Sequence, residues 1–247
     1  MTSLSMATSS DGFHCKIGEA WLQGRTAYGG ASAALALAAA KALLPELPPL
    51  VSAQIAFVGP LSGECKAKPV ALRQGRNSVF VGCDLHGSAG VALRALFLFM
   101  AERPSSLAKT APPAPTKEVG PPLPFDTRMP QFLANFDMAD AGRSEVAGWR
   151  RWVRLRKDEG FDDEGGLLLL ADALPPAAMA LSRDSGPVST TTWQLNVVGT
   201  PQPATAWHLL QAETLAAGGG TSSQVMAMWD SAGRPLASAT QSVALFY

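Results

Sequence analysis

The chain has 247 residues, which is enough for one large domain or two small ones. Hydrophobic residues make up 47% and charged residues 16%, below the roughly 25% charged residues of typical soluble domains, so we expect a large core and association into a homo-oligomer. Lysine plus arginine number 20, as do aspartate plus glutamate. This balance does not indicate nucleic acid or an anionic membrane as a partner.

The N-terminal residues MTSLSMATSSDGFHCK lack a basic stretch followed by an apolar one, so no signal peptide is expected. The longest apolar run, residues 31–44, is too short to span a bilayer and contains Lys41. Cys15, Cys65 and Cys83 share no spacing typical of metal ligands, and we expect them to be idle thiols. The sequence has no GxGxxG, P-loop or HExxH motif. We therefore expect a cytoplasmic protein with no cofactor and no metal.

The first half, residues 1–103, contains a predicted buried helix. Tyr28-Gly29-Gly30 comes before an alanine- and leucine-rich run that Pro45 ends, and a run that is apolar nearly all round is typical of a buried helix. Four strand-like runs follow: VSAQIAFV from Val51, KPVALR from Lys68, SVFVGCDLH from Ser78 and VALRALFLF from Val91. The half thus reads as one helix followed by an antiparallel sheet.

A proline-rich segment, residues 104–125 (PSSLAKTAPPAPTKEVGPPLPF), lacks periodicity and is predicted to be a linker. The second half, residues 126–247, opens with two strand-like stretches around residues 132–138 and 146–156.

The second half then repeats the order of the first. LLLLADALPPAAMAL predicts a helix that Asp172 begins and that extends to Leu181. Four strand-like runs follow: VSTTTWQLNVV from Val188, AWHLLQAETL from Ala206, SSQVMAMW from Ser222 and PLASATQSVALF from Pro235. The turn tripeptide SAG precedes the last strand of each half. One unit is therefore used twice, which predicts an α+β fold of the tandem or double hotdog type, with each curved antiparallel sheet wrapping an apolar helix.

The chain resembles the acyl-CoA thioesterase II-like family of double-hotdog proteins over nearly its whole length. The resemblance rests on WLQGRTAYGGASAALALAA, LLLLADALPPAAM and WDSAGRPLASATQSVALF, in this order. It implies hydrolysis of an acyl-CoA to free acid and CoA, with acyl-CoA as the small-molecule partner and no cofactor. The family's catalytic aspartate, hydroxyl residue and glutamine fall on Asp172, Thr191 and Gln241, although a slip of one residue within the threonine run stays open.

Strand alternation supports two of these assignments independently, because successive side chains of a strand point to opposite faces. Thr191 shares its face with Trp193 and Leu195, and Gln241 shares its face with Val243. Both polar side chains are therefore predicted to point toward the apolar interior where Asp172 lies.

The implied mechanism is water-mediated hydrolysis at one site per chain, without a covalent intermediate. Asp172 would act as the general base, with its pKa raised by an apolar environment, while Gln241 and Thr191 hold the water. Backbone N–H groups at a helix N-terminus, in the Gly29-Gly30 turn, are candidates for binding the thioester oxygen.

Other interpretations remain. Asp172 could only cap a helix, Thr191 could be an ordinary strand residue and Gln241 an ordinary buried amide. The chain could bind acyl-CoA without turnover, or hydrate an enoyl-CoA. Hydratases of this fold resemble one another in a motif with an aspartate, then a proline, then a histidine. The stretch DALPPA has the aspartate and the prolines but no histidine. A cysteine nucleophile has no recognisable histidine partner.

Overall fold

The computed structural model describes residues 4–10, 12–142, 147–182 and 186–246. Thirteen strands of this part form one sheet with antiparallel pairings, and two short strands pair separately. The strands of the large sheet are β1 (Leu4–Ser9), β2 (Gly12–Ile17), β5 (Leu50–Phe57), β6 (Gly63–Gln74), β7 (Ser78–Gly87), β8 (Gly90–Met100), β9 (Pro122–Leu123), β10 (Phe136–Asp140), β11 (Gly148–Leu155), β12 (Val188–Val197), β13 (His208–Gly218), β14 (Thr221–Asp230) and β15 (Pro235–Leu245). The short pair is β3 (Leu22–Gln23) and β4 (Thr26–Ala27). The helices are α1 (Gly29–Leu43) and α2 (Asp163–Ala171), with 3₁₀ turns η1 (Glu19–Trp21), η2 (Gln131–Asn135) and η3 (Ala177–Leu181).

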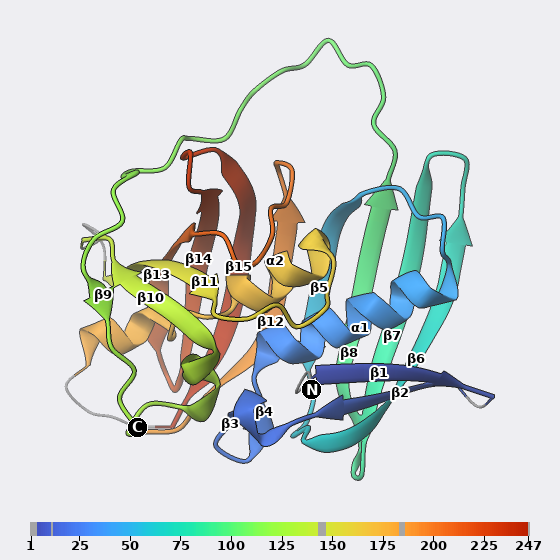
Figure 1. Cartoon of the computed structure of the whole chain (residues 1–247), viewed down its shortest axis with the longest axis horizontal. Helices are drawn as coiled ribbons and strands as arrows, with labels where there is room; N and C mark the ends of the chain where they lie inside the picture. The colour runs from blue at the N-terminus through green and yellow to red at the C-terminus, as the bar shows by residue number, and fades with distance from the viewer. Residues whose placement is uncertain (1–3, 11, 143–146, 183–185, 247) are drawn as a thin grey trace.

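The strand order repeats about the middle of the sheet. The first half contributes β6-β7-β8-β5 and the second half β12-β15-β14-β13, and the two halves join where β5 pairs with β12. The strands expected after each helix are confirmed, with ends that differ by a few residues. The strand expected around residues 132–138 begins only at Phe136, because η2 occupies residues 131–135. One expected strand began at residue 146, which lies outside the described part of the chain. Helices α1 and α2 contact each other near the centre of the molecule (Figure 1).

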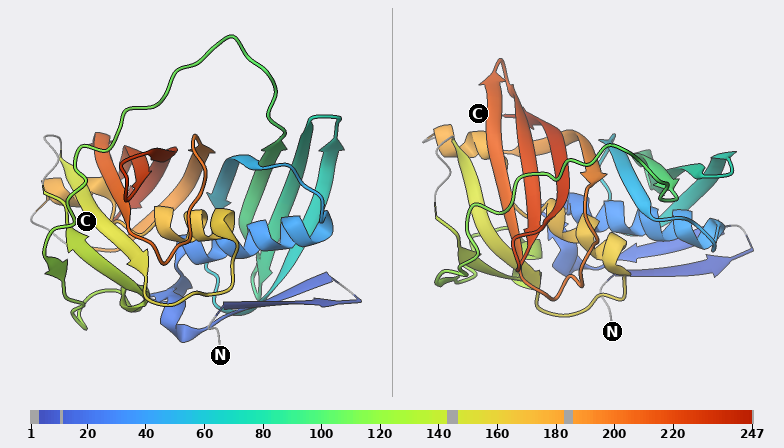
Figure 2. Two further views of the ribbon diagram at one scale, coloured as in Figure 1. Left: turned by 45° about the horizontal axis from the view of Figure 1, so that its top comes forward. Right: turned by 90° about the horizontal axis from the view of Figure 1, so that it is seen from above.

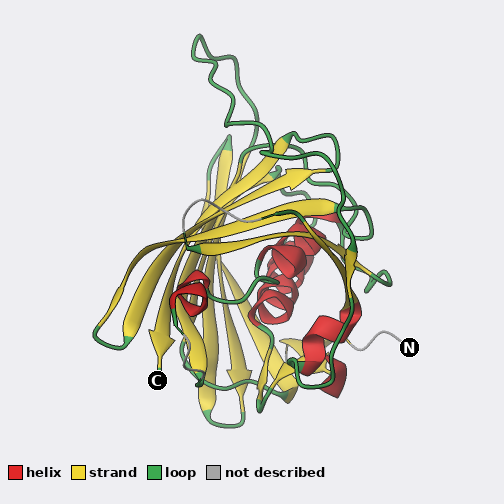
Figure 3. Cartoon of the chain, turned by 90° about the vertical axis from the view of Figure 1, so that its left-hand side faces the viewer, coloured by secondary structure: helices red, strands yellow, loops and turns green. Residues whose placement is uncertain are grey.

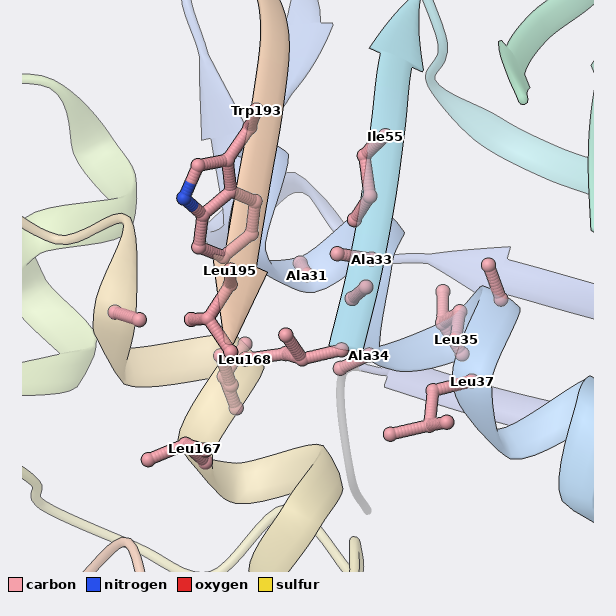
Figure 4. Packing of buried hydrophobic residues seen from close by; sticks show 14 of the residues in the cluster. Ala31, Ala33, Ala34, Leu35, Leu37, Ile55, Leu167, Leu168, Trp193 and Leu195 are labelled. Atoms are coloured by element: carbon pink, nitrogen blue, oxygen red, sulfur yellow. The ribbon is translucent and has the colours of Figure 1, made fainter. Parts of the chain in front are cut away.

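Helix α1 confirms the buried helix expected in the first half. Its alanines let it lie close to the sheet, and Ala31, Ala33 and Ala34 are fully buried against β5 and α2 residues (Figure 4). At Gly30 a Cβ atom would come within 2.8 Å of the Leu169 carbonyl oxygen, so glycine is required for this close approach. The two helices pack side by side on the same side of the sheet (Figure 3).

The second helix differs from the sequence-based expectation. A helix from Asp172 to Leu181 was expected, but α2 lies earlier in the chain and Asp172 directly follows its last residue. The helix begins after Asp162, whose side chain accepts a hydrogen bond from the Gly165 N–H at 2.9 Å. It cannot extend far beyond Asp172, because Pro175 and the next proline disfavour helical backbone before them and lack N–H donors. Only the turn η3 follows.

The proline-rich segment 104–125 connects β8 to β10: after β8 it first arches away from the sheet, and its later part runs along the second half (Figures 1 and 2). Two buried indole groups fix it: Trp152 donates to the Glu118 carbonyl at 2.7 Å, and Trp229 donates to the Pro112 carbonyl at 2.9 Å. These tryptophans belong to a second, smaller hydrophobic cluster beneath the segment. No helix in the described ranges is long and apolar enough to cross a membrane.

Candidate active site

A carboxylate and an amide meet in the interior of the second half. Gln241 on β15 is only 4% exposed, and its Nε2 donates to Asp172 Oδ1 at 2.8 Å. Its neighbours Thr240 and Ser242 are exposed on the opposite face. The inward direction expected for Gln241 from strand alternation is therefore confirmed, and Asp172 is the group that it contacts.

The N-terminus of α1 contacts the same carboxylate. The backbone N–H of Gly30 donates a hydrogen bond to Asp172. A Cβ atom at Gly29 would lie 2.5 Å from Asp172 Oδ2, so the carboxylate needs glycine at that position. The Gly29-Gly30 turn, a candidate for binding the thioester oxygen, therefore also contacts Asp172, and its role toward the thioester stays a prediction. The site thus combines a helix from the first half with a carboxylate and a strand from the second.

The environment of Asp172 makes it a base suited to neutral pH. Burial raises the pKa of its carboxyl group to about 7, while the hydrogen bonds from Gln241 and Gly30 lower it. Burial and the neighbouring Asp172 also raise the pKa of Tyr28, which therefore stays protonated and donates to the Leu169 carbonyl at 2.8 Å. A carboxyl group with a pKa near the working pH can both accept and return a proton.

A second glutamine, which sequence reasoning missed, extends the contact. Gln224 on β14 is 1% exposed and lies directly opposite Gln241 in the register of the two strands. Its Nε2 donates to Gln241 Oε1 at 2.6 Å, and its Oε1 accepts from the Ala177 N–H at 2.7 Å. No local signal identifies Gln224, because a register shift between Met228 and Trp229 means that counting outward from the β14–β15 turn does not place it opposite Gln241.

The hydroxyl assigned to the site lies on the wrong face. Thr190 pairs with Val243 and Thr192 pairs with Ser242, so Thr191 is the extra residue of a β-bulge. Thr191 is exposed, and its hydroxyl donates to the Ser242 carbonyl at 3.1 Å. The prediction that it points inward is therefore wrong. Thr190 shares the inner face with the buried Val243 and is the hydroxyl on the side of Gln241.

Two buried polar atoms near Gln241 have no hydrogen-bond partner in the described part of the protein. Trp193 is 2% exposed and pairs with Gln241 across β12 and β15, yet its Nε1 is unpartnered. In Figure 4 this nitrogen points away from Ile55. The Ser222 hydroxyl, on the strand of Gln224, is also unpartnered. Buried donors normally have a partner, so an oxygen atom of a water or ligand would satisfy them.

Other chemistry-bearing groups lie outside this site. The cysteines Cys15, Cys65 and Cys83 are free and buried, and burial raises the pKa of Cys83 to about 12. Within the described ranges no group of three histidine, cysteine, aspartate or glutamate residues could hold a metal ion.

Comparisons with solved structures indicate the hotdog fold. A hotdog-fold protein of unknown function from Alicyclobacillus acidocaldarius is 18% identical, with a TM-score of 0.83 over 98% of this chain and 96% of that one. The tesB protein of Mycobacterium avium subspecies paratuberculosis is 15% identical, with a TM-score of 0.78 over 98% and 96% of the two chains. An acyl-CoA thioesterase II of Mycobacterium marinum is 17% identical, with a TM-score of 0.73 over 100% and 96%. A search of curated proteins gave no significant match.

Family comparison covers almost the whole sequence. The acyl-CoA thioesterase N-terminal domain matches residues 17–100, and the acyl-CoA thioesterase C-terminal domain matches residues 105–245. The second matched region begins at the start of the segment that links the halves, and it contains Asp172, Gln224 and Gln241. The chain belongs to the acyl-CoA thioesterase family.

Proposed function

We propose that this protein hydrolyses an acyl-CoA thioester to the free acid and CoA, with Asp172 as the general base. The observation that carries the proposal is the half-buried Asp172 carboxyl group, whose pKa is raised to about 7 and which accepts a hydrogen bond from Gln241. Family membership supports the reaction class. A group of this kind is what activation of water at neutral pH requires.

The reaction runs in two steps. Asp172 accepts a proton from a water molecule as the water oxygen attacks the thioester carbonyl carbon, which gives a tetrahedral oxyanion. The oxyanion then collapses, the carbon–sulfur bond breaks, and Asp172 returns the proton to the CoA thiolate. Gln241 and the Thr190 hydroxyl orient the water, with Thr190 in the role first assigned to Thr191. The unpartnered Trp193 N–H donates to the oxyanion.

We also propose the finer architecture behind this site. Residues 1–103 and 126–247 are two hotdog units of a double hotdog, joined by residues 104–125. The repeated strand order about the β5–β12 pairing supports this division. Each chain has one active site, in which the first unit supplies the Gly30 N–H and the second supplies Asp172 and Gln241. Self-association and a cytoplasmic location stay predictions.

The test is a thiol-release assay with the purified full chain on short, medium, long, branched and aromatic acyl-CoAs. We expect release of free CoA from at least one of these classes and its loss in Asp172→Asn. The matched control is Asp126→Asn, which changes an exposed carboxylate paired with Arg128 and should leave the rate unchanged.

Three outcomes would contradict the proposal. Thiol release that persists in Asp172→Asn would remove Asp172 as the base. Binding of CoA esters without release of thiol would favour a non-catalytic acyl-CoA-binding protein. Loss of enoyl-CoA absorbance without thiol release would favour a hydratase.

A further inference from the structure

Two buried glutamines on neighbouring strands hold both ends of the loop that carries Asp172. Asp172 is the first residue after α2, and Ala177 is the first residue of η3. Gln241 donates to the Asp172 carboxylate at one end of this loop, and Gln224 accepts from the Ala177 N–H at the other. The glutamines are joined to each other at 2.6 Å. A continuous chain of hydrogen bonds therefore runs from a backbone amide to the catalytic carboxylate.

The direction of this chain is fixed at its start. The Ala177 N–H can only donate, so Gln224 must present its Oε1 to Ala177 and its NH₂ group to Gln241. Gln241 must then accept through its Oε1, which leaves its NH₂ group facing Asp172. Without Gln224, only Asp172 itself would select the orientation of the Gln241 amide, and a protonated Asp172 can donate to the Gln241 carbonyl oxygen instead of accepting from its NH₂ group.

Burial makes the arrangement dependent on Gln224. Both glutamines are almost fully buried, so bulk water cannot freely replace a lost amide partner. Gln224 has no hydrogen bond of its own to Asp172 among those described, and its influence passes through Gln241. A turned Gln241 would repel the ionised carboxylate of Asp172 and accept a hydrogen bond from its protonated form, and both effects favour the protonated form.

We propose that Gln224 is a positioning residue that holds the Gln241 amide with its NH₂ group toward Asp172. The expected effect of Gln224 on the reaction rate rests on the proposed function. The expected effect of Gln224 on the titration of Asp172 does not depend on that function. The Gln241 hydrogen bond lowers the pKa of Asp172, so loosening this bond should raise that pKa and move the rise of activity to higher pH.

The test compares Gln224→Met and Gln224→Glu with the wild type. Methionine fills the space but neither accepts nor donates, and we expect kcat to fall roughly ten- to a hundredfold with little change in KM. The Gln224→Glu carboxylate still accepts from Ala177, but when ionised it draws the Gln241 NH₂ group to itself. We therefore expect a larger loss at neutral pH in this variant, and a ratio of variant to wild-type rate that increases as the pH falls and the introduced carboxylate is protonated.

The matched control is Gln211→Met, which removes a hydrogen-bonded amide of β13 whose partners are Arg150 and Glu213. It should leave both kcat and the pH profile unchanged. Circular dichroism and urea unfolding establish that each variant is folded. If Gln224→Met does not fold, Gln224→Glu, which retains the Ala177 acceptor, carries the test.

A second readout needs no activity. The carboxyl ¹³C resonance of Asp172, assigned by its absence in Asp172→Asn, should titrate at higher pH in Gln224→Met than in the wild type. If the wild type releases no thiol but this shift occurs, the proposed function fails and the positioning role stands. If the wild type is active and the variants change neither the Asp172 titration nor the pH profile, the positioning role is overturned.

Discussion

Replacing Asp172 with asparagine should stop hydrolysis and, at alkaline pH, stabilise the fold. The wild-type carboxyl group has a pKa of about 7 in the folded protein, against an ordinary value of 3.8. The folded state therefore holds its proton over a pH range in which the unfolded state has lost it. The stability associated with the neutral form is complete below about pH 4 and is lost as the pH rises to about 7.

The size of the effect follows from this difference. One pKa unit corresponds to about 1.4 kcal/mol, so keeping the ionised carboxylate in the folded protein above pH 7 costs about 4 kcal/mol. At pH 5 the cost is about 2 kcal/mol, because this pH lies only part of the way from the pKa of the unfolded state to that of the folded state. The asparagine NH₂ group will meet the donors of Gln241 or Gly30 unfavourably, but this cost does not vary with pH. The stability gained by Asp172→Asn should therefore be about 3 kcal/mol larger at pH 9 than at pH 5, because about two pKa units of the interval lie above pH 5.

Urea unfolding of both proteins at pH 5 and pH 9 measures this difference, provided that the slope against urea concentration is the same in all four experiments. Asp126→Asn removes an exposed carboxylate whose pKa is lowered by Arg128, and it should give no gain at pH 9. The reasoning would be refuted if Asp172→Asn had the same effect at both pH values, or lost stability relative to the wild type as the pH rose.

Three further predictions concern the groups around Asp172. The wild-type kcat/KM should rise with pH around an apparent pKa of about 7, and Gln241→Leu should move this rise to higher pH. The variant should also lower the rate, because it loses a hydrogen bond that lowers the pKa of Asp172. An unchanged pH profile in the variant would show that Gln241 does not act on Asp172. Thr190→Val should lower kcat while Thr191→Val does not, and the opposite result in the same assay would restore Thr191 to the site. Trp193→Phe removes only the indole donor and should lower kcat roughly a hundredfold with KM nearly unchanged; an unchanged kcat would show that the indole does not bind the oxyanion.

The sequence predicts the strands well because their signal is local. Apolar runs bounded by turn residues give the central strands of both halves, and the alternation along β15 gives the correct face for Gln241. The start of α2 was missed because its first turns contain two glycines, which are unfavourable in helices. The tertiary structure requires a small residue at Gly166, because a Cβ atom there would come within 2.9 Å of the Ala204 Cβ. No local pattern reveals that contact.

The two errors within the site have the same origin. Alternation places Thr191 inside only if β12 is regular, and the bulge after Thr190 reverses the faces on its two sides. Gln224 is an unremarkable strand residue until the register with β15 sets it opposite Gln241. The positions of Thr191 and Gln224 both depend on how the strands pair. The sequence of a single strand does not give this pairing. Asp172 and Gln241 were assigned from the family resemblance, and the alternation along a single strand gave the correct face for Gln241.

The corrected place of Asp172 favours the proposed chemistry more than the expected place would. An aspartate that begins a helix is stabilised as an anion by that helix's free N–H groups, which lower its pKa and weaken it as a base. Asp172 instead follows the C-terminus of α2, whose end disfavours a negative charge, and faces the N-terminus of α1, whose end favours one. The effects of the two helix ends oppose each other, and burial is the largest influence on the pKa of the Asp172 carboxyl group. The Gly30 N–H then orients Asp172 without stabilising the anion enough to return its pKa to the ordinary value.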